Sequence, residues 1–307
     1  MNGSDLSTYL LRVPFLAQLP LEEVGVTRLA GLTNVNFLLT AGSDRYVLRV
    51  PGKGTSEYIN RTNESVAAHS ASRAGVNAEL LHFDDNDGLM VTRFVDDART
   101  MTAEAFAADL GAVGRAGEVF RRLHASATPF SVPFALFSMV DEYKALLEAK
   151  GAGLPSGYGD VQSLLGAARS ALEAAPVSLV PSHCDPLCEN FLDTGSSMFL
   201  IDYEYAGNND PMWDLADLSV EGGFTEEQDN MLLRSYFSGS FAAEQQARMV
   251  IYKAMCDLLW TLWGAIQHAN GNPADDFWAY ALGRFERCQR LTATDSFHHH
   301  VEYLVGR

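Results

Sequence analysis

The sequence predicts an α+β protein of two lobes, in which a small antiparallel β-sheet lobe with one helix precedes a larger, mainly helical lobe. Three observations predict this fold class. Strand-like alternation is concentrated in the first 95 residues, polar and glycine-containing turns separate the strands, and helical spacing dominates after residue 100. With 307 residues, 47% hydrophobic and 20% charged, the chain can bury one large core or two moderate ones.

The first lobe is expected to span residues 1–95. A short helix is expected over 9–19, ended by Pro20, and a longer helix over 60–74. Turn signals at 42–44 and 84–88 indicate hairpins. The expected strands are 24–29, 36–40, 46–50, 78–83 and 89–95.

The second lobe, residues 96–307, begins with a polar, hinge-like segment at 96–100. Thr102 can cap a helical stretch over 102–125, which is expected to divide near 111–114. The other expected elements are amphipathic helices over 137–150 and 161–175, and short apolar strands over 177–180 and 198–201.

Three polar residues beside these strands have a regular spacing. Asn190 lies five positions after Asp185, and Asp202 lies twelve after Asn190. Transfer of a γ-phosphoryl group needs a carboxylate near the attacking hydroxyl and oxygen ligands for Mg²⁺, and protein kinases present these groups in the same order. We therefore expect Asp185 to act as the catalytic carboxylate, with Asn190 and Asp202 as metal ligands. His183 is expected to hold the loop through backbone hydrogen bonds.

Each of these residues has an ordinary alternative role. Asp185 precedes a proline and can start a turn, and Asn190 can cap local backbone. Their joint spacing, followed by a second acidic cluster at 214–217, favours the catalytic interpretation. A zinc site built from His183, Cys184 and Cys188 would lack an evident fourth ligand.

A loop and a basic residue indicate where phosphates would bind. The loop 30–36 contains Asn34 but a single glycine, so by itself it predicts a plain hairpin. Arg49, on the third expected strand, can bind phosphate oxygens with its planar guanidinium, and Lys53 is the rival for that role. Glu64 lies fifteen residues after Arg49 and can pair with it, the alternative being a solvated helix face.

The chain has 39 acidic and 22 basic residues, a formal charge of −17. This charge repels nucleic acid and anionic membranes and favours a cationic small substrate. Four cysteines without a CxxC pair indicate reduced thiols. The sequence shows neither a signal-type N-terminus nor an apolar run of about eighteen residues, so we expect a cytoplasmic protein without membrane insertion. Nothing in the sequence indicates the oligomeric state.

Two parts of the chain resemble the choline/ethanolamine kinase family. The first part comprises residues 31–36 and 46–52. The second comprises HCDPLCEN at 183–190 and IDYEY at 201–205. The similarity is closest to the bacterial choline kinase-like branch, within the wider aminoglycoside phosphotransferase and protein-kinase-like fold. It implies ATP and Mg²⁺ as cofactors, Asp185 as base, Asn190 and Asp202 as metal ligands, and Arg49 at the phosphates.

The same resemblance implies a substrate pocket. Trp260, Trp263 and Tyr280 match aromatic positions of the family's choline pocket, and Glu221 matches an acidic one. A quaternary ammonium needs aromatic faces and a carboxylate, because it cannot donate an N–H hydrogen bond. Helix packing in the core is the ordinary alternative for each aromatic residue.

The predicted function is therefore ATP- and Mg-dependent phosphorylation of the hydroxyl of a small amino alcohol, with choline as the first candidate. Ethanolamine is an alternative, since its ammonium can use Glu221. An aminoglycoside would need several separated carboxylates rather than stacked rings. A catalytically silent binding module of the same fold would have no chemical need for Asp185, Asn190 and Asp202 together.

Overall fold

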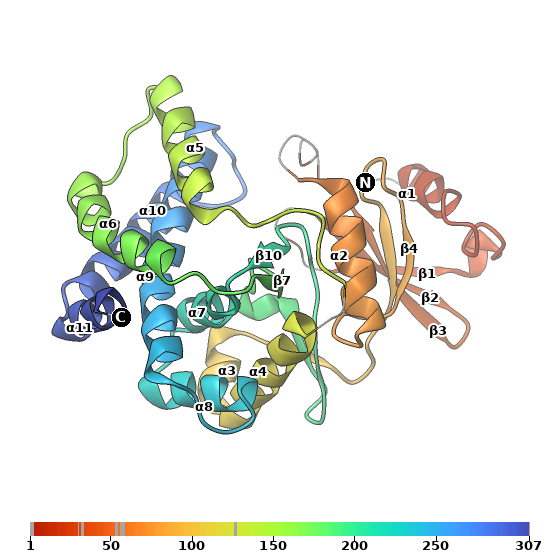
Figure 1. Cartoon of the computed structure of the whole chain (residues 1–307). Helices are drawn as coiled ribbons and strands as arrows, with labels where there is room; N and C mark the ends of the chain where they lie inside the picture. Colours follow the sequence, from red (N-terminus) through yellow and green to blue (C-terminus); the bar gives the residue numbers. More distant parts are fainter. Residues whose placement is uncertain are drawn as a thin grey trace.

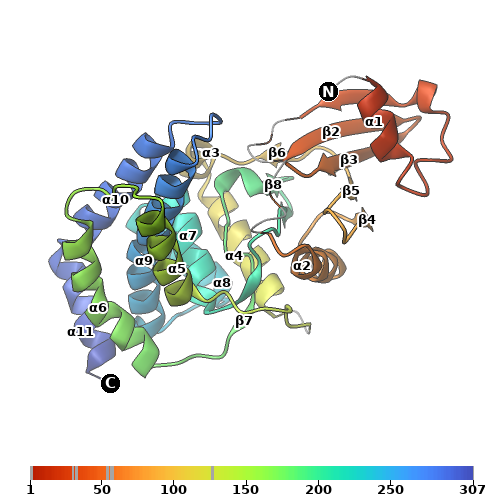
Figure 2. The same cartoon turned by 90° about the horizontal axis from the view of Figure 1, so that it is seen from above.

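The computed structural model describes residues 3–29, 31, 34–52, 55, 59–125 and 128–306. It confirms the predicted α+β class, with a sheet-containing lobe and a helical lobe side by side (Figures 1 and 2). The first lobe is a five-stranded antiparallel sheet in the order β1-β2-β3-β5-β4. Its elements are α1 (Gly3–Leu10), β1 (Gly25–Arg28), β2 (Val35–Ala41), β3 (Asp44–Val50), α2 (Arg61–Arg73), β4 (Leu80–Phe83) and β5 (Met90–Arg93).

The apolar side chains of this sheet form their own core. Leu39, Leu48 and Val91, from three adjacent strands, are fully buried, because alternate residues of a strand point to the same face. Helix α2 lies on the side of the sheet that faces the second lobe (Figures 1 and 2). It begins at an Asn60 cap, whose side chain accepts a hydrogen bond from the backbone N–H of Asn63.

The helix predicted over 9–19 is wrong in its bounds. Helix α1 ends at Leu10, and residues 11–19 form turns that contribute Val13 and Leu16 to the core of the sheet. Pro14 explains the difference, because proline has no N–H to donate and disfavours helical backbone in the residue before it.

The second lobe contains most of the helices and two small sheets, ordered β6-β8-β9 and β10-β7. Strand β6 follows the link after β5 and pairs with β8, so the chain has entered the second lobe by Arg99. The elements are β6 (Arg99–Thr100), α3 (Ala103–Ala108), α4 (Leu110–His124), α5 (Leu136–Ala149), α6 (Tyr158–Ala174), β7 (Val180–Ser182), β8 (Phe191–Asp193), β9 (Met198–Leu200), β10 (Gly207–Asn209), α7 (Pro211–Glu221), α8 (Glu226–Tyr236), α9 (Ala243–Ala269), α10 (Phe277–Thr292) and α11 (Asp295–Val305).

Two predicted boundaries in this lobe are wrong. The helical stretch divides at Asp109, whose carboxylate caps α4 by accepting from the N–H of Ala112, and not at the glycines of 111–114. Those glycines lie inside α4, which packs on α8 so closely that a Cβ on Gly117 would lie 2.7 Å from the carbonyl oxygen of Leu232. The strand expected over 177–180 instead spans Val180–Ser182, where β10 supplies its hydrogen-bonding partner.

Helix α9 is the central helix of the second lobe. It packs against α5, α6, α7, α10 and α11, and Figures 1 and 2 show these helices around it. Its 27 residues include an 18-residue window that is apolar enough to cross a membrane, with a mean hydropathy of 1.3, but 83% of that window is buried inside the protein. The apolar character of α9 is therefore that of a core helix.

Candidate active site

The loop that carries Asp185 is held in place from α7. The carboxylate of Asp214 accepts hydrogen bonds from the backbone N–H groups of His183 (2.7 Å) and Cys184 (2.8 Å). The indole N–H of Trp213 donates to the carbonyl oxygen of Cys184, whose φ of +70° is unusual for a residue with a side chain. These contacts stabilise a backbone conformation that otherwise costs free energy, and so they determine where Asp185 lies.

His183 has the structural role that the sequence predicts. Its Nε2 lies 2.9 Å from the carbonyl oxygen of Ile201, which ties the loop to the chain just before Asp202. Asn190 ends a 3₁₀ turn in the same loop and donates from Nδ2 to the carbonyl oxygen of Asp185 at 3.2 Å. Asp185, Asn190 and Asp202 thus lie on connected segments. Within the described chain the loop cysteines form no zinc-type cluster with His183.

Asp185 has the electrostatics of a proton acceptor. Its side chain is half-buried, and burial, followed by the nearby charges of Glu221 and Asp202, raises its pKa to about 8. A carboxylate with a pKa near neutral pH is well suited to accept a proton from a hydroxyl group, because it is stronger as a base than an exposed carboxylate.

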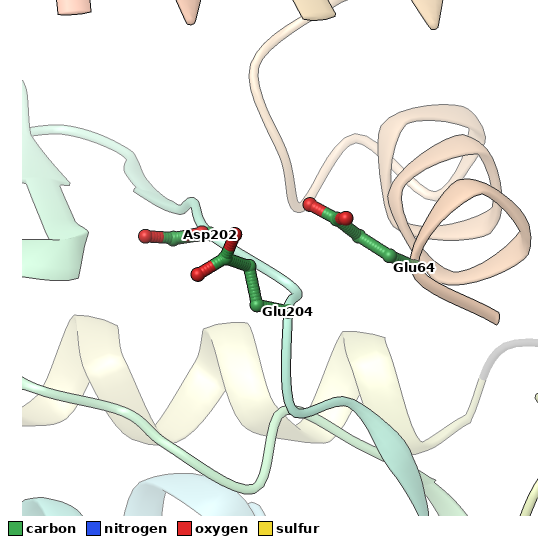
Figure 3. A group of neighbouring side chains, drawn as sticks. All are labelled: Glu64, Asp202 and Glu204. Carbon is green, nitrogen blue, oxygen red and sulfur yellow. The ribbon is translucent and has the colours of Figure 1, made fainter. Parts of the chain in front are cut away.

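A network of buried charges joins the two lobes next to Asp202. Arg49 on β3 pairs with Glu64 on α2, as the sequence predicts, and its Nη1 also lies 2.7 Å from Oδ1 of Asp202. Arg61 joins the same network through Glu64 (2.6 Å) and Glu204 (2.9 Å). Figure 3 shows the three carboxylates, with Glu64 approaching from α2 and the other two from the connection between β9 and β10. Arg61 and Glu204 were not predicted as site residues.

The carboxylates of this network differ in their access to solvent. Oxygen atoms of Glu64, Asp202 and Glu204 all lie within 4.8 Å of one another. All three side chains contact arginine, but that of Asp202 is 34% exposed, whereas those of Glu64 and Glu204 are 1% and 7% exposed. Burial and the charge of Glu204 raise the pKa of Asp202 to about 7, against the opposing effect of Arg49. Hard oxygen donors at an acidic, accessible position fit Mg²⁺, and Asp202 is the carboxylate that an ion can reach.

Asn34 lies at the edge of the same region. It is buried, and its Oδ1 accepts a hydrogen bond from the N–H of Gly52 at 3.2 Å. Its Nδ2 has no hydrogen-bond partner among the described residues and can donate to an oxygen of a ligand. Three of the seven residues of the predicted phosphate loop, namely Ala30, Leu32 and Thr33, lie outside the described residues, and so does Lys53.

On the other side of Asp185, helices α7, α9 and α10 bring together the predicted substrate residues. Trp263 forms edge contacts with Trp260 (centroids 6.4 Å apart) and Tyr280 (5.7 Å). Gly264 makes room for this arrangement, since a Cβ there would lie 2.7 Å from Cδ1 of Tyr280. Trp260 is buried, while Trp263 and Tyr280 are partly exposed. The aromatic residues therefore pack against one another and also form part of a solvent-accessible surface.

Glu221 has a partner that the sequence did not reveal. Arg284 on α10 pairs with Glu221, lies 3.3 Å from Asp257, and places its guanidinium 5.0 Å from the centre of the Tyr280 ring. Arg284 is 3% exposed and the Glu221 side chain 15%, so a buried cation is paired with a partly exposed carboxylate. A usable signal was present in the sequence, because Tyr280 and Arg284 are four residues apart and such residues are neighbours on a helix.

Comparison with known proteins identifies the family. Residues 25–250 match the model of the phosphotransferase enzyme family. A solved choline/ethanolamine kinase family protein from Mesorhizobium loti is 51% identical, with a TM-score of 0.90 over 99% of both chains. The chain belongs to this phosphotransferase family, in its choline/ethanolamine kinase branch.

Two more distant structures are similar over most of their length. Choline kinase LicA from Streptococcus pneumoniae is 28% identical with a TM-score of 0.75, covering 89% of this chain and 95% of that one. A structure of LicA in complex with AMP is 27% identical with a TM-score of 0.72, covering 88% and 92%. The chain is accordingly an ATP-dependent kinase that acts on an alcohol group.

Proposed function

We propose that this kinase transfers the γ-phosphoryl group of ATP to the hydroxyl of a small amino alcohol, with choline as the first candidate and ethanolamine as the second. The observation that carries the proposal is the position of Asp185. The charges of Asp202 and Glu221 both act on it, so it lies near the Arg49–Asp202 network, which suits phosphates and a metal ion, and near the acidic, aromatic region of α7, α9 and α10, which suits a cation.

The residues have distinct roles in this reaction. Asp185 accepts the proton of the substrate hydroxyl and orients its oxygen for in-line attack. Asn190 and Asp202 hold Mg²⁺, which when bound neutralises charge on the phosphates. Arg49 provides a fixed positive charge beside Asp202 and is oriented by Glu64, and the unpartnered Nδ2 of Asn34 donates to the nucleotide.

The amine is bound by the aromatic residues. Trp263 and Tyr280 present partly exposed rings, and Trp260 supports them from the core. Cation–π attraction binds a quaternary ammonium without needing N–H donors, which supports choline. The choline kinase relatives support the same choice. Glu221, paired with Arg284, contributes through its charge and through the orientation of Tyr280.

The test is ADP release by the purified chain with choline, ethanolamine or an aminoglycoside, each with and without Mg²⁺. We expect turnover that depends on an amino alcohol and on Mg²⁺, fastest with choline. Asp185→Asn should reduce kcat by about 10²–10⁴-fold, the usual contribution of a general base, while leaving ATP affinity nearly unchanged. Turnover only with the aminoglycoside would show that the substrate is not a small amino alcohol. Full activity of the variant would refute the role of Asp185.

A further inference from the structure

Asp217 is a buried carboxyl group on the face of α7 that also carries Asp214 and Glu221. Residues three and four apart share one helix face, so these three carboxylates form a row from the catalytic loop to α10. Asp214 is used by the catalytic loop and Glu221 by Arg284. Asp217 is 1% exposed, and its Oδ2 accepts a hydrogen bond from the indole N–H of Trp260 at 3.4 Å. Its Oδ1 has no hydrogen-bond partner in the described chain.

The charges around Asp217 leave it without a counter-ion. Arg284 and Arg287 pair with Glu221 and Asp257, two cations with two anions. No ion pair reaches Asp217 among the described residues. Burial, then the charges of Glu221 and Asp185, raise its pKa well above the ordinary value, and only Arg284 and the Trp260 N–H oppose this. A buried carboxylate without a counter-ion is strongly unfavourable, so Asp217 takes up either a proton or an external cation.

The surroundings of Asp217 indicate which cation that would be. It is hydrogen-bonded to a tryptophan of the proposed amine site, and it lies one turn along α7 from Asp214, which binds the backbone of the loop that carries Asp185. An oxygen with a free lone pair can accept a hydrogen bond from an ammonium that carries N–H groups. A quaternary ammonium cannot make this bond and is bound only through its charge and the aromatic faces.

We propose that Oδ1 of Asp217 accepts an N–H hydrogen bond from the substrate's ammonium group, and that Asp217 thereby determines how strongly the enzyme distinguishes amino alcohols by their degree of N-methylation. This inference rests on the proposed function and names a specificity-determining residue for it. Trp260 orients the carboxyl group through its indole N–H and thereby couples Asp217 to the aromatic residues.

The experiment compares four substrates with the wild-type enzyme and Asp217→Asn: choline, N,N-dimethylethanolamine, N-methylethanolamine and ethanolamine. We expect the variant to lose at least about tenfold more kcat/KM with ethanolamine than with choline, because a hydrogen bond to a charged group is lost only in the first case. The loss of kcat/KM with the two intermediate substrates should lie between these limits and increase with the number of N–H groups on the ammonium. An equal loss with all four substrates would mean that Asp217 only supports Trp260, and would overturn the proposal.

Two further variants show whether a change in the substrate ratio is specific to Asp217. Asp229→Asn neutralises a carboxylate of α8 that is bound by Lys253, outside the site, and should leave the ratio between substrates unchanged. If Asp217→Asn does not fold, Asp217→Glu keeps the charge but displaces the oxygens by one methylene, and should shift the same ratio. An unchanged ratio in that variant would likewise overturn the proposal.

Binding without turnover separates this inference from the proposed function. Calorimetric titration with ethanolamine and with choline measures the affinity of the amine alone. If no substrate is phosphorylated but Asp217→Asn selectively weakens binding of ethanolamine, the proposed function fails and the role of Asp217 stands. If turnover is found with an unchanged substrate ratio, the role of Asp217 fails and the proposed function stands.

Discussion

Replacing Glu64 by glutamine is expected to destabilise the enzyme and weaken ATP binding together. Glu64 is 1% exposed and accepts hydrogen bonds from Arg49 and Arg61, which are 4% and 6% exposed. Removing one partner of a buried ion pair costs about 3–5 kcal/mol when the other charge is left unpaired. This is the upper limit here, because Arg49 and Arg61 keep Asp202 and Glu204 as partners. At about 2–4 °C of Tm per kcal/mol for chains near this size, 3–5 kcal/mol corresponds to about 6–20 °C, so we expect a decrease in Tm of up to about 20 °C.

The assay is thermal unfolding followed by kinetics at a temperature where both proteins are folded. Because Arg49 also contacts Asp202, the loss of Glu64 should change its orientation and raise the KM for ATP more than the KM for the amino alcohol. Glu79→Gln is the matched control, as Glu79 pairs with Arg93 at the surface and such pairs contribute about 0–1 kcal/mol. If the two variants unfold at the same temperature, the reasoning about the buried network is wrong.

Two other predictions concern catalysis and substrate binding. Asp185 acts as a base only when it is ionised, and its raised pKa is about 8. We therefore expect kcat/KM to increase with pH through about 8 and to level off above it. A profile that is flat from about pH 6 to 9 would contradict this. Trp263→Ala should raise the KM for choline by about 2- to 30-fold, equivalent to about 0.5–2 kcal/mol of cation–π attraction, with a kcat close to that of the wild type. Trp260→Ala, at a position 4% exposed, should instead lower Tm by removing core packing. If both variants lower Tm equally and neither changes the KM for choline, the two tryptophans have a purely structural role.

Much of the active site could be predicted because its residues follow one another along the chain. Asp185, Asn190 and Asp202 lie within eighteen residues, and the strands between them have clear apolar patterns. The pairing of Arg49 with Glu64 could also be predicted. One helix, α2, follows the strand that carries Arg49, so a carboxylate beside this buried cation has few possible positions. The catalytic roles of these residues stay predictions until the variants are measured.

Other features depend on residues that are distant in the sequence. Arg61 and Glu204 are 143 positions apart and form a buried ion pair, and Glu221 and Arg284 are 63 apart and form a part-buried one. Apart from the spacing of four residues between Tyr280 and Arg284, no local pattern distinguishes these residues from surface charges, because burial is decided only when α2, α7 and α10 pack. The error in the first helix was of another kind, since Pro14 was visible in the sequence and indicated the break.

The sequence by itself determined the α+β class and the order of the two lobes, and it predicted a phosphoryl-transfer loop, because these follow from local patterns and short spacings. Only the tertiary structure decided which charges are neutralised. It paired Glu221 with Arg284, and it left Asp217 buried with one oxygen unpartnered in the described chain. Whether a buried carboxyl group can receive a substrate depends on which cations pack beside it, and those cations come from another helix.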